Sequence, residues 1–200
     1  METISASKIP PILYILAGPP GVGKSHNWQA FVPLKPLNHD EIAADLKKEG
    51  IRNYEEYAEQ KIWEQIHENI TLGVDFGIEL NLGYSKHYGL LRKIYGHCKH
   101  YAIHVLLFFT DVDSLCSVRA TEREKAGGQE VEPAAIEEMR CNTIGLLKKN
   151  IAMFSYVSFI DVTYNSVELV YSGYYPNRNH EFVNDVLPNW VSTNFPEIAI

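Results

Sequence analysis

The chain has 200 residues, of which 46% are apolar and 22% charged, a composition typical of a folded globular protein. A chain of this length can build one substantial core, so we expect a single domain over residues 1–200. The formal net charge of −7 gives the whole protein no attraction for a polyphosphate backbone. We therefore expect no nucleic-acid partner.

Membrane insertion and secretion are also disfavoured. The most apolar segment, residues 103–109, is far shorter than the roughly 20 residues that a membrane-spanning helix needs. Residues 1–8 lack the pattern of a signal peptide. Three cysteines form no CxxC pair, which suits a reducing compartment. These observations predict a cytoplasmic protein with no membrane partner.

The first expected strand covers residues 12–17, an apolar run that ends at Gly-Pro. Its unbroken apolar character indicates burial on both faces, as in a parallel sheet covered by helices. A short helix over residues 24–31 and a brief strand over residues 36–38 follow. Between residues 40 and 72 apolar side chains recur at helical spacing with a break near Gly50, which predicts two helices.

The rest of the chain continues this alternation. The expected elements are a strand over residues 76–82, a helix over 84–99, a strand over 101–109, helices over 111–126 and 133–150, strands over 155–162 and 166–171, and a helix over 180–193 that Pro188 can divide. The fold class that this rhythm predicts is α/β. We expect a P-loop NTPase fold with a central, mainly parallel sheet flanked by helices, and a helical lid.

A phosphate-binding motif follows the first strand. The pattern GxxxxGK[ST] is formed by Gly18, Pro19, Pro20, Gly21, Val22, Gly23, Lys24 and Ser25. Its position between a buried strand and a helix is the context that a P-loop requires. Glycines let the backbone wrap around phosphates, and the exposed N–H groups supply positive potential. We predict that Lys24 reaches the β- and γ-phosphates of ATP or GTP and that Ser25 ligates Mg²⁺.

Three carboxylates are placed near expected strand ends, where ligands meet in such sheets. Asp40 could act as a general base toward an acceptor hydroxyl, with a helix N-cap as the alternative. Glu79 could bind the substrate or help organise Mg²⁺, with a solvated strand end as the alternative. Asp111 resembles a Walker B aspartate, but it also suits the cap of the next helix, and we favour that interpretation.

Arginines are concentrated in the expected lid. Arg119 and Arg123 share one helix face, Gly127-Gly128 follows as a hinge, and Arg140 lies on the next helix. Arginines that a closing lid brings to the phosphates stabilise the charge of a transferred phosphoryl group. The alternative is surface pairing with Glu122, Glu124, Glu137 or Glu138.

Together these motifs resemble the zeta-toxin family of P-loop kinases over about residues 12–150. The resemblance is carried by the glycine loop, by Asn38-His39-Asp40, by Glu79-Leu80-Asn81-Leu82-Gly83, by Arg119 and Arg123 running into Gly127-Gly128-Gln129, and by Arg140. Leu80 and Asn81 stand where the family has two threonines, and Gln129 stands where it has histidine.

The resemblance implies a kinase that uses ATP or GTP with Mg²⁺ to phosphorylate a small-molecule hydroxyl, such as the sugar of UDP-N-acetylglucosamine. It implies that Asp40 is the base, that Lys24 and Ser25 hold the phosphates and Mg²⁺, and that Glu79 and Asn81 bind substrate. The lid charges would be Arg119, Arg123 and Arg140. Many members are restrained by a small antitoxin protein, which makes such a protein a candidate partner.

Two other classes of function remain open. A nucleotide-binding regulatory protein, or an NTPase without a small-molecule acceptor, would keep the same glycine loop. A nucleic-acid end kinase is disfavoured because the chain is acidic and shows no basic cluster.

Overall fold

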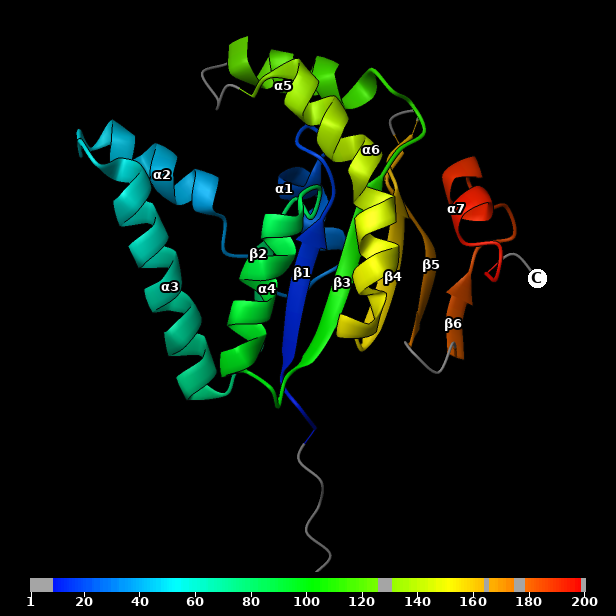
Figure 1. The fold of residues 1–200 in the computed structure, drawn as a ribbon, viewed down its shortest axis with the longest axis horizontal. Helices are drawn as coiled ribbons and strands as arrows, with labels where there is room; N and C mark the ends of the chain where they lie inside the picture. The colour runs from blue at the N-terminus through cyan, green and yellow to red at the C-terminus, as the bar shows by residue number, and fades with distance from the viewer. Residues whose placement is uncertain (1–8, 126–130, 164–165, 175–178, 199–200) are drawn as a thin grey trace, which may run out of the picture.

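The computed structural model describes residues 9–125, 131–163, 166–174 and 179–198. Their centre is a six-stranded sheet in the order β2-β1-β3-β4-β5-β6 (Figure 1). The strands are β1 (Ile12–Ala17), β2 (Phe76–Glu79), β3 (Ala102–Phe109), β4 (Tyr156–Asp161), β5 (Glu168–Tyr174) and β6 (Asn179–Val183). Strands β2, β1, β3 and β4 run parallel, and β5 and β6 each pair antiparallel with the strand before them.

Helices cover both faces of this sheet. They are α1 (Lys24–Asn27), α2 (His39–Lys48), α3 (Tyr54–Leu72), α4 (Ser85–His97), α5 (Leu115–Lys125), α6 (Pro133–Asn150) and α7 (Asn189–Asn194). Helices α4 and α6 lie on one face and α1 on the other, while the hairpin of α2 and α3 stands beside the sheet (Figure 1). Helix α5 crosses the edge at which the parallel strands end.

The core has two parts because successive residues of a buried strand point to opposite faces. Leu13 and Ile15 of β1 join the larger cluster, to which α3, α4, α6 and α7 contribute. Tyr14 and Leu16 join the smaller cluster on the other face. This double burial explains why β1 is apolar without interruption.

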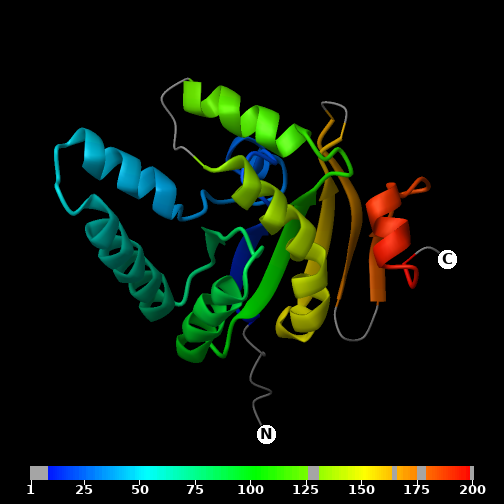
Figure 2. The same cartoon turned by 45° about the horizontal axis from the view of Figure 1, so that its top comes forward.

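The carboxyl ends of the parallel strands define the edge at which a site can form. The loop after β1 runs into α1 at this edge, between α2 and α5 (Figure 2). A mainly parallel α/β sheet flanked by helices is the fold class that the sequence predicts, and the structure confirms it.

Three local expectations need correction. Residues 36–38 form only a single parallel bridge, Leu37 to Ile78, at the edge of the sheet. Strand β2 ends at Glu79, and Leu82 beyond it has a left-handed φ of 54°. The helix expected over residues 180–193 is wrong, because its first part forms β6 against β5 and only its end forms α7.

Other expectations agree or fall outside the described ranges. Strands β1, β3 and β4 and helices α2, α3, α4 and α6 lie where the sequence predicts them. The helical segment after the glycine loop is α1 followed by a 3₁₀ turn over Trp28–Ala30. The Gly127-Gly128 hinge and Gln129 lie outside the described residues. Within those residues, no helix is both long and apolar enough to cross a membrane.

Candidate active site

The ammonium group of Lys24 is enclosed by the loop that carries it, and the residue is only 3% exposed. Its Nζ donates to the carbonyl oxygens of Gly18 at 2.8 Å and Pro19 at 3.1 Å, and to Asn81 Oδ1 at 2.9 Å. Burial lowers the pKa of Lys24, and the carboxylate of Glu79, 3.6 Å away, opposes that shift. A buried cation held mainly by neutral oxygens is well suited to receive an anionic ligand.

Glycine is required at several positions of the loop, of which Gly21 and Gly23 lie closest to α5. At Gly21, which has a φ of +79°, an added Cβ would lie 2.1 Å from the carbonyl oxygen of Cys116 in α5. At Gly23, with a φ of +101°, an added Cβ would approach Asn27 Nδ2 at 3.0 Å and Arg119 Nη1 at 3.9 Å. These close contacts place α5 directly over the glycine loop.

Ser25 and Glu79 form the part of the site that is suited to a metal ion. Ser25 Oγ donates to Glu79 Oε2 at 2.9 Å. A hydroxyl and a carboxylate side by side are oxygen donors of the type that Mg²⁺ prefers. The residues therefore fit the Mg²⁺ and nucleotide that the motif predicts, and Glu79 is not a merely solvated strand end.

Asp40 lies in the first turn of α2 with its side chain 51% exposed. Asn38, not Asp40, caps this helix, because Asn38 Oδ1 accepts from the backbone N–H groups of Asp40 at 2.9 Å and Glu41 at 3.3 Å. The carboxylate of Asp40 has His39 Nδ1 3.8 Å away. The charge of Asp40, with a smaller effect than Glu79, opposes the lowering of the Lys24 pKa by burial. Its carboxylate is thus not committed to capping.

The three predicted lid arginines have different surroundings. Arg119 reaches the glycine loop at Gly23, and no carboxylate pairs with it among the described residues. Arg123 lies one turn further along α5.

Arg140 is paired instead with carboxylates. Its Nη2 lies 2.7 Å from Asp113 Oδ1, and its Nε and Nη2 donate to both oxygens of Glu137 at 2.9 and 2.8 Å. These donors hold the pKa of Glu137 near 2. Arg140 therefore joins α6 to the segment before α5, and a nucleotide would have to compete with two carboxylates for it.

The loop after β2 carries residues that the motif analysis missed or interpreted differently. Asn81 is a partner of Lys24, and its carbonyl accepts from the backbone N–H of Gly18 at 3.3 Å. His87 Nδ1 accepts from the backbone N–H of Tyr84 at 3.3 Å. Burial, with Lys86 and Lys24, lowers the pKa of His87 to about 4, so the imidazole is neutral near pH 7. No local motif in the sequence indicates that His87 is neutral, because its lowered pKa comes from burial in the folded protein.

Helix α6 is packed onto the same loop. An added Cβ at Gly83 would lie 2.6 Å from Met139 Cβ, so only glycine leaves room for the helix. Tyr84 Oη donates to Glu138 Oε2 at 2.9 Å. The segment Glu79-Leu80-Asn81-Leu82-Gly83 is thus held between the glycine loop and α6.

Asp111 does not cap the next helix, which corrects the interpretation favoured from sequence. Helix α5 begins only at Leu115, and Asp111 Oδ2 accepts from the backbone N–H of Trp190 at 3.0 Å. Asp161, on the neighbouring strand, accepts from Trp190 Nε1 at 2.8 Å. Asp111 therefore anchors α7.

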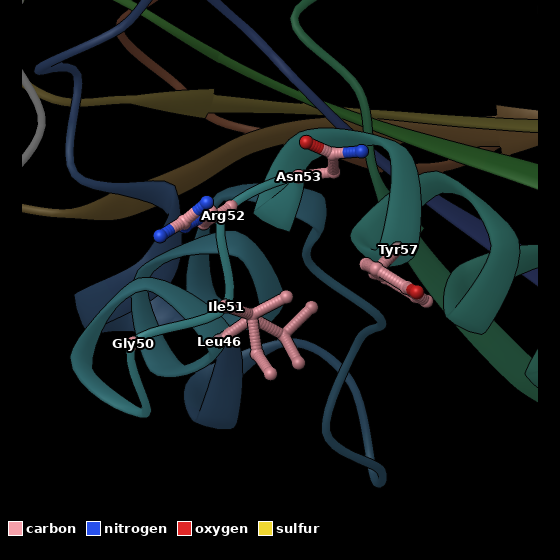
Figure 3. Close-up of a pocket in the computed structure, with 6 residues that line it drawn as sticks. All are labelled: Leu46, Gly50, Ile51, Arg52, Asn53 and Tyr57. Carbon is pink, nitrogen blue, oxygen red and sulfur yellow. The ribbon is translucent and has the colours of Figure 1, made fainter.

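A separate pocket of about 450 Å³ lies at the turn of the α2–α3 hairpin (Figure 3). Its lining residues are Leu46, Gly50, Ile51, Arg52, Asn53 and Tyr57. None of these six belongs to the glycine loop or carries a catalytic group in the arrangement described above.

No protein-family model and no curated protein sequence matches the chain. Solved structures are similar to it at low identity. A chain of the PezAT chromosomal toxin–antitoxin system of the human pathogen Streptococcus pneumoniae superposes with a TM-score of 0.61 and 13% identity, over 96% of this chain and 85% of that one. A chain of the AvrRxo1-ORF1:-ORF2 complex determined with ATP gives a TM-score of 0.62 and 11% identity, over 81% of this chain and 58% of that one.

A chain of the Pnkp1/Rnl/Hen1 RNA repair complex gives a TM-score of 0.57 and 18% identity, over 74% of this chain and 49% of that one. Our chain therefore spans only about half of the AvrRxo1 and RNA repair chains. At such identities the similarity concerns the fold. The chain has the α/β fold of P-loop kinase structures, with a mainly parallel sheet flanked by helices.

Proposed function

We propose that the protein is a kinase that transfers the γ-phosphoryl group of Mg²⁺-bound ATP or GTP to a hydroxyl of a small molecule. The observation that carries this proposal is the grouping of Lys24, Ser25, Glu79, Asp40 and Arg119 at one edge of the sheet. A P-loop alone is compatible with any nucleotide-binding protein. The carboxylate of Asp40, which does not cap α2, is in addition suited to accept the proton of an acceptor hydroxyl.

In the proposed reaction Asp40 takes the proton of the acceptor hydroxyl as the new O–P bond forms. The bond between the γ-phosphorus and the bridging oxygen breaks, and the nucleoside diphosphate leaves. Lys24 and Arg119 stabilise the negative charge on the transferred group. Ser25 and Glu79 would hold Mg²⁺, which would neutralise phosphate charge. Arg123 and Arg140 contribute positive charge from the lid. To contact the phosphates, Arg140 must give up its ion pair with Asp113 or Glu137.

The acceptor proposed first is a sugar nucleotide such as UDP-N-acetylglucosamine, in line with the resemblance to zeta toxins. Asn81 would contact it once nucleotide draws Lys24 toward the phosphates, while Glu79 stays with Mg²⁺. The solved relatives from toxin–antitoxin and ORF1:ORF2 complexes support the further proposal of a small antitoxin partner. Co-purification with the product of a neighbouring small gene would test that partner.

Acceptor-dependent release of ADP or GDP tests the proposed function. The panel should contain sugar nucleotides, nucleosides, small alcohols and a 5′-hydroxyl oligonucleotide. We expect stimulation by a small hydroxyl compound and none with Lys24→Ala. A nucleotide-binding regulatory protein would bind ATP or GTP without stimulation by any acceptor, and an end kinase would respond to the oligonucleotide alone.

A further inference from the structure

Both ends of the Asn38 side-chain amide are engaged, and they face two different parts of the site. Asn38 Oδ1 accepts from the backbone N–H groups of Asp40 and Glu41 at 2.9 and 3.3 Å. Asn38 Nδ2 donates to Glu79 Oε2 at 2.8 Å. The chemistry fixes the orientation of the amide, because only its oxygen can accept from N–H groups and only its nitrogen can donate to a carboxylate.

The backbone places Asn38 opposite Glu79. Leu37 pairs with β2 through two hydrogen bonds, from its N–H to the carbonyl of Gly77 at 2.7 Å and from the N–H of Glu79 to its own carbonyl at 2.9 Å. Asn38 follows immediately and begins α2. The backbone hydrogen bonds of Leu37 therefore bring Asn38 and Glu79 together.

Glu79 continues the connection into the nucleotide end of the site. The same oxygen, Oε2, accepts from Ser25 Oγ at 2.9 Å, and Oε1 lies 3.6 Å from Lys24 Nζ. Hydrogen bonds thus run from Ser25 through Glu79 and Asn38 to the backbone of Asp40. No other side chain among the described residues hydrogen-bonds both Glu79 and the first turn of α2.

We propose that Asn38 is a positioning residue that couples the Mg²⁺ end of the site to the candidate base Asp40. This inference rests on the proposed kinase function. Asn38 holds the first turn of α2 at a fixed distance from Glu79, and so holds Asp40 in place relative to the γ-phosphate. Misplacing a catalytic group by about 1 Å can cost roughly 100-fold in rate.

The variant Asn38→Asp isolates the coupling, since aspartate caps a helix as well as asparagine does. It replaces the donor toward Glu79 by an acceptor, so two carboxylate oxygens face one another. We expect kcat to fall about 10- to 100-fold while the nucleotide Kd changes little. The loss should appear in kcat and not in the nucleotide Kd, which separates a misplaced Asp40 from a damaged nucleotide site. A purely structural cap, which aspartate preserves, would leave kcat unchanged.

A second variant and a matched control complete the test. Asn38→Ser keeps a capping oxygen but is too short to reach Glu79, so its kcat should also be low. Asn53→Asp makes the same substitution at the N-cap of α3, where the side chain forms no capping hydrogen bond and lines the pocket at the turn of the α2–α3 hairpin (Figure 3). It should have the kcat of the wild type.

Melting temperature reports the contact independently of turnover. The Asn38–Glu79 hydrogen bond predicts that Asn38→Asp melts at a lower temperature than wild type, because two carboxylates then face each other, and that Asn53→Asp does not. An unchanged melting temperature, or wild-type kcat, in Asn38→Asp would overturn the coupling. A wild-type protein without acceptor-dependent turnover would overturn the proposed function, and the coupling role with it, even if melting showed the contact.

Discussion

Lys24 and Asp40 are separated in the sequence by a helix and a turn, yet they act on each other electrostatically at one edge of the sheet. One is buried and cationic, and the other is half exposed and anionic. A buried ammonium suits phosphate oxygens, whereas an accessible carboxylate suits a proton from an incoming hydroxyl. Their different exposure is the basis for the different tasks that we propose for them.

Asp40→Asn should abolish transfer and leave nucleotide binding nearly intact. The amide keeps the size of the side chain but cannot take a proton, and loss of a general base costs about 100- to 10,000-fold. Turnover should be measured beside nucleotide affinity. Unchanged turnover would show that Asp40 is not the base.

Gly21→Ala should weaken nucleotide binding and lower the melting temperature. The new Cβ would meet the carbonyl oxygen of Cys116 at 2.1 Å, at a φ of +79° that alanine rarely adopts. Such strain costs about 1–3 kcal/mol. The matched control is Gly89→Ala in α4, where an added Cβ would meet nothing within 4 Å. This substitution should stabilise the helix by about 1 kcal/mol. Equal effects of the two substitutions would contradict this account.

At the scale of elements, α5 and α6 approach the glycine loop in different ways. Helix α5 contacts it directly through Cys116 and Arg119, while α6 packs on the loop after β2 through Met139 and Glu138. The two helices contact each other, and Arg140 of α6 pairs with Asp113 just before α5. A motion of either helix would therefore change access to the phosphates.

Arg119→Ala and Arg140→Ala should have separable effects. Arg119 faces the glycine loop, so its loss should lower kcat about 100-fold or more with little change in melting temperature. Arg140 bridges two carboxylates besides its proposed lid charge, so its loss should cost up to about 1 kcal/mol of stability and lower kcat less than the loss of Arg119 does. The kcat and the melting temperature of both variants should be measured and compared with those of the wild type. Identical losses in both assays would argue against this division of roles.

Burial of His104 in the sheet should make the free energy of unfolding depend on pH in the acid range. His104 of β3 lies between the rings of Tyr14 and Tyr156, and its Nε2 lies 2.9 Å from Ser158 Oγ. Burial lowers the pKa of His104 from 6.5 to about 4. Because the unfolded chain binds the proton more readily, stability should be lost as pH falls from about 6.5 to 4, by up to about 3 kcal/mol.

Chemical denaturation across that pH range tests the contribution of His104. His104→Gln should make the acid limb of the stability curve shallower, since glutamine does not titrate, and His87, whose pKa is also lowered to about 4, should keep part of that limb. The exposed His100 provides the control, and His100→Gln should leave the limb as it is in the wild type. If His104→Gln and wild type ran parallel from about pH 7 to 4, the burial argument would fail.

Across the whole molecule, features that depend on consecutive residues could be predicted from the sequence. Features that depend on contacts between residues far apart in the sequence could not. The glycine loop and the apolar strand before it are local signals, and both lie where expected. Residues 179–183 form a strand only because β5 lies beside them, and their own sequence reads equally well as helix. The hydrogen bond from Trp190 to Asp111 spans 79 positions, so no local pattern could reveal it.

In the candidate site, too, the local motif could be predicted from the sequence and the long-range contacts could not. Its phosphate-binding residues follow from a motif whose spacing encodes their geometry. The contact of Lys24 with Asn81 and that of Asn38 with Glu79 join positions 57 and 41 residues apart, and they arise from the order of the strands in the sheet. Sequence therefore identifies the participants, while the fold determines which of them touch.

The most direct test of the central claim is a search for a phosphorylated product. The protein should be incubated with a metabolite extract and ATP or GTP labelled at the γ-phosphate, in parallel with Lys24→Ala and Asp40→Asn. The account predicts a labelled small molecule with wild type and none with either variant, while Asp40→Asn still binds nucleotide. Release of labelled phosphate alone, or equal labelling by wild type and Asp40→Asn, would contradict it.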